Sequence, residues 1–225
     1  MTTTLIILID HLILRPLLSA SMVPATADVM AEKFGSEPRE WAKSYRNVLK
    51  DWDSYWADLD VNGDASLRHW REGRWRIAKA LFRLTSLPYP PQHLIGLHLD
   101  KLPRDIGRRC GEAWRSGAAE GITALAKQDV RVVILAPTLP AALINGLVDA
   151  AGLEKSIAGV YGPDELERVG LEGFEWKWLC SLVRGDPAST LLMSAGGAPI
   201  PEAVTADPPD DLSTLPAWLS ATLKV

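Results

Sequence analysis

The chain has 225 residues, of which 47% are hydrophobic and 23% charged, a composition typical of a globular protein that excludes a disordered one. The formal net charge of −4, without any stripe of Lys and Arg interleaved with aromatic residues, gives no electrostatic case for binding nucleic acid. The two cysteines, Cys110 and Cys180, are too few for a disulfide framework, so we expect buried thiols and a reducing, cytoplasmic compartment.

The first element in chain order is an apolar run from Leu5 to Ile9 that ends at Asp10. Because the run is continuous rather than alternating, it predicts a strand over residues 4–9 that is buried on both faces. Asp10 and His11 interrupt it well short of the ~20 residues that a membrane span needs. It also lacks the basic region and cleavage site of a signal peptide. We therefore expect neither a membrane span nor a leader.

Residues 16–115 have a helical pattern and no convincing strand. The apolar spacing over residues 26–50 predicts a helix that stops at Gly35, and Ser36 then caps a second helix. Two further helices are predicted at about 66–85 and 91–114. This segment also contains most of the tryptophans, which we expect mainly in its core: Trp41, Trp52, Trp56, Trp70, Trp75 and Trp114.

From residue 117 onward, helices and strands alternate. The helices are predicted at 117–128, 140–151, 172–184 and 215–223, and the strands at 130–135, 157–161, 190–193 and 203–206. Strands separated by helices of about a dozen residues form right-handed crossovers and a parallel sheet. The sequence thus predicts an α/β fold: a Rossmann-like parallel-sheet core (residues 1–15 and 116–225) with an inserted all-helical cap (residues 16–115).

Ligands of open α/β sheets bind at the carboxyl ends of the strands. Asp10, Thr138 and Ser194 each follow the end of a predicted strand, so we expect these three residues to converge in space.

This order of parts resembles the haloacid dehalogenase (HAD) superfamily, in the subgroup whose helical cap follows the first strand. The resemblance rests on the strand ending at Asp10, on the cap, and on residues 132–153, which are similar to the second motif strand and its helix. Arg168 stands six residues before Phe174, as a basic residue does in the third motif, and residues 188–194 resemble the last motif strand.

The family's catalytic positions are only partly present. The signature Asp-x-Asp-x-Thr reads Asp10, Leu12 and Leu14 here, so only the nucleophile position is retained. The Ser or Thr that ends the second motif strand is Ala136, and Thr138 follows two residues later. The resemblance places Arg168 where a lysine holds the nucleophile's charge, with Lys177 as a second candidate.

The acidic residues of the fourth motif have no counterpart in the loop after Ser194, and the acidic residues that follow appear too far downstream to replace them: Asp207, Asp210 and Asp211. Magnesium requires several oxygen ligands, and one aspartate does not suffice. The resemblance therefore implies neither a magnesium-dependent phosphatase nor a bound metal. Residues 58–66 match the start of a calcium loop, but His69 stands where its glutamate belongs, so we predict a turn there. No glycine pattern indicates a nucleotide cofactor.

The preferred interpretation is a metal-independent, non-hydrolytic enzyme of the isomerase, cyclase or pericyclase type. It acts on an apolar small molecule, such as a terpenoid- or polyketide-like biosynthetic intermediate, in the cleft between cap and core. Asp10 accepts a proton or stabilises charge, Arg168 holds the charge of Asp10, and Thr138 orients the substrate. The expected substrate contacts are His11, Leu12, Leu14, Trp52, Trp56 and Ser194. His11 follows the strand end, so its side chain can also point away from Asp10.

Two alternatives stay open. One is a haloacid-dehalogenase-type hydrolase, in which Asp10 attacks carbon, displaces halide and forms an ester that water hydrolyses. The other is a binding protein without catalysis, in which Leu12 and Leu14 pack beneath the cap. The sequence leaves open the substrate, the reaction and the oligomeric state, with a homodimer as one alternative.

Overall fold

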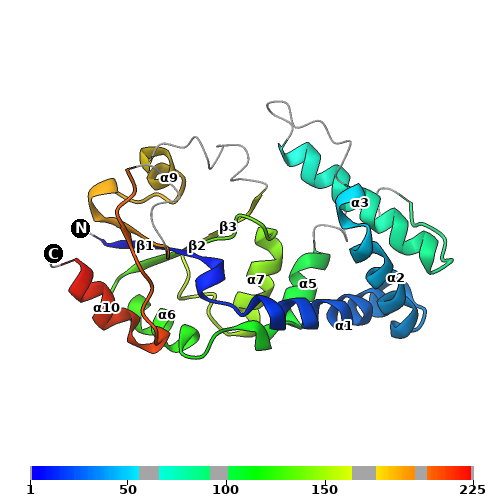
Figure 1. Cartoon of the computed structure of the whole chain (residues 1–225), viewed down its shortest axis with the longest axis horizontal. Coiled ribbons are helices and arrows are strands. Elements are labelled where there is room, and N and C mark those ends of the chain that lie inside the picture. Colours follow the sequence, from blue (N-terminus) through cyan, green and yellow to red (C-terminus); the bar gives the residue numbers. More distant parts are fainter. Residues whose placement is uncertain (1, 56–65, 92–100, 164–175, 196–201, 224–225) are drawn as a thin grey trace.

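The computed structural model describes residues 2–55, 66–91, 101–163, 176–195 and 202–223. These residues form a parallel five-stranded sheet in the order β3-β2-β1-β4-β5 (Figure 1). The strands are β1 (Thr4–Leu8), β2 (Arg131–Leu135), β3 (Gly159–Tyr161), β4 (Thr190–Met193) and β5 (Thr205–Ala206). Because β1 pairs with β2 on one side and β4 on the other, the first strand lies at the centre of the sheet.

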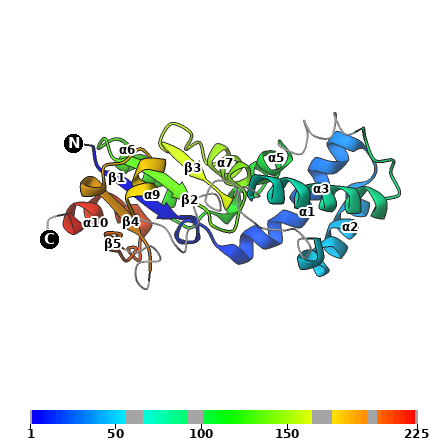
Figure 2. The ribbon, with the colours of Figure 1, turned by 90° about the horizontal axis from the view of Figure 1, so that it is seen from above.

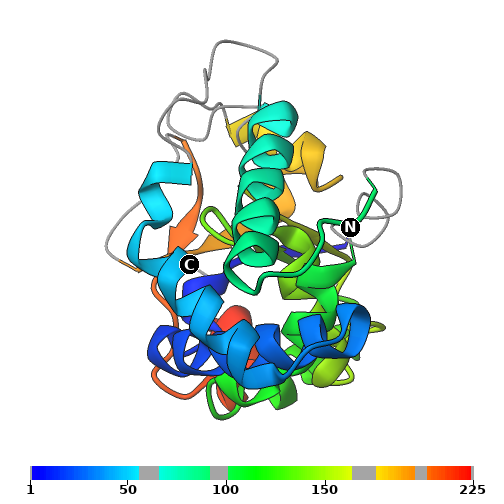
Figure 3. The ribbon, with the colours of Figure 1, turned by 90° about the vertical axis from the view of Figure 1, so that its right-hand side faces the viewer.

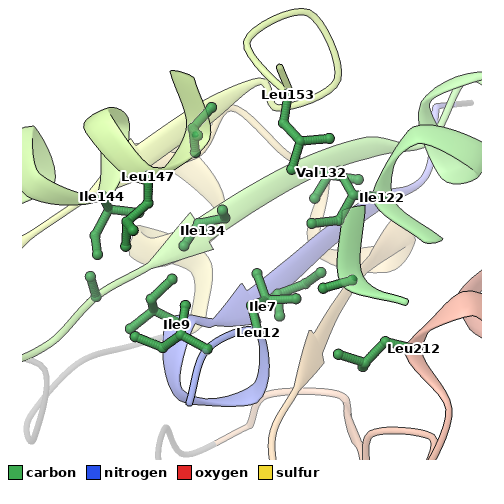
Figure 4. Close-up of a cluster of buried hydrophobic side chains, with 14 of the residues drawn as sticks. Ile7, Ile9, Leu12, Ile122, Val132, Ile134, Ile144, Leu147, Leu153 and Leu212 are labelled. Carbon is green, nitrogen blue, oxygen red and sulfur yellow. The ribbon is translucent and has the colours of Figure 1, made fainter. Parts of the chain in front are cut away.

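Strand β1 is buried on both faces, as its continuous apolar run predicts. Leu5 and Ile7 point to the face covered by α6 (Ala118–Ala126), α7 (Ala141–Ala150) and α10 (Leu215–Thr222) (Figure 4). Ile6 points to the opposite face, which α9 (Trp176–Leu182) covers. All three side chains are fully buried. The period of two in a strand therefore gives a three-layer α/β core.

The segment between β1 and α6 is helical wherever the structure describes it, apart from connecting loops. Its helices are α1 (Arg15–Phe34), α2 (Pro38–Lys50), α3 (Ser66–Leu84) and α5 (Leu102–Arg108). We call these four helices the cap. They lie beside the carboxyl-terminal edge of the sheet (Figures 1 and 2), and α2 contacts both α1 and α3.

Two expectations about the cap helices were wrong. Helix α1 begins at Arg15, well before residue 26, because Pro16 fits the first turn and Pro24 is accommodated inside the helix. Ser36 does not cap α2, because its backbone is left-handed (φ 68°) and Glu37 occupies the cap position. The predicted helix stop at Gly35 is confirmed, with a φ of 79° that suits glycine.

An aromatic cluster holds the cap together, as the tryptophan content indicates. Trp41 is fully buried, and its indole N–H donates to the carbonyl of Gly35 at 2.7 Å. The ring of Phe82 on α3 meets Trp41 edge-on at 5.3 Å and Phe34 at 5.0 Å. These contacts join α3 to α1 and α2, above which it lies in Figure 3.

The chain segments that enter and leave the cap pair with each other. The N–H of Leu14 donates to the carbonyl of Ala113, and the N–H of Arg115 donates to the carbonyl of Leu12, both at 2.8 Å. The Trp114 indole donates to the carbonyl of Leu147 on α7 at 3.0 Å. These contacts bring the two ends of the helical segment together beside α7.

Helix α5 packs against α7 of the core through two glycines. A Cβ on Gly107 would lie 2.1 Å from the Leu143 carbonyl oxygen, and one on Gly146 would lie 2.1 Å from that of Arg104. Beside them, Arg104 donates two hydrogen bonds to the Asp149 carboxylate, at 2.7 and 2.8 Å, and Arg108 donates a third. Only glycine permits this approach, which ties the last cap helix to the core.

Cys110 and Cys180 are both buried free thiols, as expected. Burial raises the pKa of Cys110 to about 11, so this thiol stays protonated near neutral pH. In the described parts of the chain, no helix has the length and apolar character required to cross a bilayer.

We expect Gly146→Ala to lower the free energy of unfolding by about 1–3 kcal/mol, because the new methyl group forces α5 and α7 apart. Urea denaturation followed by circular dichroism measures this change. Gly111→Ala is the control, since its Cβ would meet only the Ala150 methyl group, at 3.2 Å. Equal stability of wild type and Gly146→Ala would contradict the close helix contact.

The Asp149 pKa lies below its ordinary value of 3.8, chiefly because Arg104 hydrogen-bonds to the carboxylate. The folded state thus binds fewer protons than the unfolded state, and this stabilisation is present above about pH 4 and lost as the pH falls through the folded pKa. Asp149→Asn should lower the free energy of unfolding by about 1 kcal/mol at pH 7, and this difference from the wild type should shrink below pH 4. Asp28→Asn is the control, because Asp28 also pairs with an arginine, Arg109, and its side chain is more exposed than that of Asp149. If the stability difference between Asp149→Asn and the wild type did not change with pH, the ion pair with Arg104 would not be its cause.

Candidate active site

Asp10 lies directly beyond the carboxyl end of β1, in a 3-10 turn over Ile9–His11. The turn is closed by the N–H of Leu12, which donates to the carbonyl of Ile9 at 2.9 Å. The side chain of Asp10 is half exposed (49%), so it is accessible from the edge of the sheet. The strand end therefore presents this carboxylate where ligands of open α/β sheets bind.

Arg15, at the start of α1, connects Asp10 with Thr138. Its Nε donates to the Asp10 carboxylate, and its Nη2 donates to the Thr138 hydroxyl at 2.7 Å. Nε and Nη2 lie on the same edge of the planar guanidinium, so one rigid group fixes both partners. We call these three residues the Arg15 fork. Arg15 was not among the predicted site residues, because no motif spacing distinguishes it from other surface arginines.

His11 points toward the end of β4 rather than into the cleft. Its Nε2 accepts a hydrogen bond from the N–H of Ala195 at 3.3 Å, and its carbonyl accepts one from Arg115. Burial is the main cause that lowers the His11 pKa, with Arg115 acting in the same direction and Asp10 and Asp207 opposing them. A neutral imidazole accepting from a backbone N–H braces the two strand ends.

The ends of β4 and β5 complete this edge of the sheet. Ser194 is buried directly after β4, and its N–H donates to the carbonyl of Ala206 at 3.1 Å. Asp207 follows β5, close enough for its charge to act on His11. Asp207 therefore lies near this edge of the sheet despite its distance along the chain. β5 is parallel to β4, which returns residue 207 to the same edge.

An apolar pocket of about 230 Å³ lies beside the Arg15 fork, between the cap and the loop after β2. Its wall consists mainly of aliphatic and aromatic side chains of α1, α2, α3 and α5, with Thr138, Leu139, Pro140 and Leu143 from the core side. Thr138 belongs to both the pocket wall and the fork. The charged pair is thus connected to an apolar chamber through one hydroxyl group.

The structure places the other predicted site residues as follows. Trp52, in the turn after α2, lines the pocket. Leu12 is fully buried in the core beside Ile9 (Figure 4), and Leu14 is 43% exposed before α1, so neither is among the residues of the pocket wall. Trp56 and Arg168 lie outside the described residues. Of the three strand-end residues expected to converge, Asp10 and Thr138 are joined through Arg15, whereas no such link to Ser194 is among the contacts of the described residues.

These residues do not fit a divalent metal ion. The Asp10 carboxylate is bound by Arg15, and Leu12, two residues on, is hydrocarbon packed in the core. Within the described ranges, no group of three or more His, Cys, Asp or Glu side chains is arranged to hold an ion. Because magnesium needs several oxygen ligands, we derive no step through a metal.

No protein-family model and no curated protein matches the sequence. Among solved structures, the chain is similar to a 2-haloacid dehalogenase from Pseudomonas syringae pv. Tomato, with 14% identity, 98% of this chain and 99% of that chain covered, and a TM-score of 0.56. It is also similar to the L-2-haloacid dehalogenase from Xanthobacter autotrophicus, with 17% identity, coverage of 88% and 71%, and a TM-score of 0.45. The Pseudomonas likeness shows that the chain has the HAD fold.

We expect magnesium to leave the protein's stability unchanged. A ligand that binds only the folded state raises the melting temperature, and one at 100 times its Kd adds about 2.7 kcal/mol. With the Asp10 carboxylate engaged by Arg15, millimolar magnesium should shift the Tm by no more than sodium chloride of equal ionic strength. A larger shift that Asp10→Asn abolishes would show that the site holds the ion.

Proposed function

We propose that this chain is a metal-independent, non-hydrolytic enzyme of the isomerase, cyclase or pericyclase type. Its substrate is an apolar small molecule bound in the pocket between cap and core. The observation that carries the proposal is the Arg15 fork, in which one guanidinium holds Asp10 and Thr138 at the edge of an apolar pocket.

The fork limits what Asp10 can do. A carboxylate oxygen that accepts a hydrogen bond from a guanidinium is less nucleophilic, because part of its charge is already compensated. The same pair forms a fixed dipole next to an apolar chamber, where charges act more strongly than in water. This arrangement suits stabilising the charge that develops in an apolar substrate, or accepting one proton from it.

The pocket supports an apolar substrate class. Its apolar wall favours hydrocarbon and can hold a flexible molecule in one reactive conformation. A cavity of 150 Å³ accommodates benzene, so about 230 Å³ corresponds to about nine or ten non-hydrogen atoms. A small terpenoid- or polyketide-like fragment has these properties.

Each residue of the site then has a role. Asp10 stabilises charge or accepts a proton, Arg15 holds it in place, and Thr138 orients the substrate at the pocket wall. Trp52 forms part of that wall. Arg168 remains a proposed further partner for Asp10.

The second candidate is a haloacid-dehalogenase-type hydrolase. Asp10 favours it, since a half-exposed carboxylate follows the central strand of a fold similar to that of a 2-haloacid dehalogenase. In that case Arg15 would have to release Asp10 before the carboxylate attacks carbon. A third candidate is a binding protein that uses the pocket without chemistry.

Mass balance separates the three candidates. We expect the wild-type protein, incubated with an apolar metabolite extract and no added metal, to convert at least one compound into a product of identical mass, detected by liquid chromatography and mass spectrometry. Hydrolytic dehalogenation replaces a halogen by a hydroxyl group and releases halide, so the mass of the product differs from that of the substrate, and a binding protein changes no compound. Chloride release from 2-chloropropionate that Asp10→Asn abolishes would establish the hydrolase and overturn our proposal.

Arg15→Gln should lower the rate of the mass-conserving reaction by about 10²–10³-fold, the usual effect of losing one preorganised charge. The fold should survive, because a half-exposed ion pair contributes about 0–1 kcal/mol. Arg109→Gln is the matched control, since Arg109 is similarly exposed and pairs with Glu32, and neither residue lines the pocket. Equal rates for both variants and wild type would exclude a catalytic role for the fork.

A further inference from the structure

Thr26 on α1 contains a buried polar atom that the fold does not satisfy. The residue is 4% exposed and lines the apolar pocket. No described residue meets full hydrogen-bond geometry at its Oγ1, although the Tyr45 hydroxyl lies close enough to interact with it. A helical threonine commonly bonds to a carbonyl of the preceding turn, and Thr26 does not. Buried hydroxyls without a partner are rare, and each one requires an explanation.

Tyr45 on α2 brings a second hydroxyl to the same part of the pocket. The residue is 5% exposed, and burial raises the pKa of its phenol to about 12, with the neighbouring Thr26 hydroxyl opposing the shift. Tyr45 therefore remains neutral at physiological pH and keeps its proton for donation. Two uncharged hydroxyls thus lie side by side in the pocket wall.

The surroundings make these hydroxyls the polar end of an otherwise apolar chamber. The neighbouring wall side chains from α1 and α3 are hydrocarbon or aromatic, among them Met22, Met30 and Phe82. Arg74 also lines the pocket. At the end of the pocket formed by Thr26 and Tyr45, two uncharged hydroxyls favour an uncharged oxygen, since they carry no positive charge to compensate a buried anion.

We propose that the pocket recognises an apolar molecule bearing one uncharged oxygen, a ketone, aldehyde or alcohol, which hydrogen-bonds to Thr26 Oγ1 beside Tyr45. This rests on the proposed function in placing the substrate in the same pocket. It adds to that function that the substrate carries one polar group and that Thr26 binds this group. Thr26 is then a specificity-determining residue.

Acetophenone and isopropenylbenzene test the proposal, because they have nearly the same shape and differ in whether a carbonyl oxygen is present. We measure their binding by ligand-observed NMR titration to the wild type, Thr26→Val and Thr26→Ser. Thr26→Val should weaken acetophenone binding on the order of fivefold and leave isopropenylbenzene unaffected. Thr26→Ser keeps the hydroxyl and should retain the wild-type preference.

The melting temperature supplies a second measurement. If Thr26 Oγ1 is unsatisfied in the free protein, Thr26→Val should raise the Tm while it weakens acetophenone binding. A lowered Tm would reveal a structural partner for the hydroxyl and overturn the proposal. Absence of binding of both probes, or equal effects of Thr26→Val on both, would also overturn it. If Arg15→Gln left the reaction rate unchanged, the proposed catalysis would be refuted. The preference of the pocket for acetophenone over isopropenylbenzene would be unaffected by that result.

Discussion

One guanidinium group determines what this sheet edge can do. Arg15 compensates the charge of Asp10 and holds Thr138 at the same time, so the Oδ1 of Asp10 is engaged in a hydrogen bond with the guanidinium. The interaction contributes little to folding, since both side chains are substantially exposed. Its importance is electrostatic. The guanidinium is a permanent cation that is part of the chain, and it lies against the Asp10 carboxylate.

The rest of the structure supports this arrangement and the pocket beside it. Continuous burial of β1 on both faces makes the strand rigid up to Leu8, so the turn with Asp10 starts from a fixed point. On the cap side, the Gly107 and Gly146 contact holds α5 against α7, and these helices supply adjacent parts of the pocket wall. The helix packing that ties cap to core therefore also sets the shape of the chamber. The unsatisfied hydroxyl of Thr26 lies within that shape, where selection for stability alone would favour valine.

The sequence predicted the sheet well because its strands are short apolar runs separated by helices, a pattern with one common solution. It also placed Asp10 and Thr138 together, since parallel strands end at one edge. The sequence did not predict element bounds and side-chain positions that depend on tertiary contacts. The start of α1 depends on a proline accommodated within a helix, and Leu12 packs inward because the 3-10 turn rotates it into the core. Arg15 could not be recognised, because its partner Thr138 is distant in sequence. The return of Asp207 depends on the position of β5, a strand of only two residues.

In the proposed function, the Arg15 guanidinium supplies the positive charge beside Asp10 and no metal ion takes part. A crystal structure determined in magnesium chloride tests it most directly. The concentration should be roughly 20 to 50 mM, about one hundred times the Kd of a typical weak site. Our account predicts that the Arg15 Nε remains hydrogen-bonded to the Asp10 carboxylate and that no octahedral density contacts Asp10. An ion coordinated by Asp10, with the Arg15 side chain displaced from Thr138, would contradict the account.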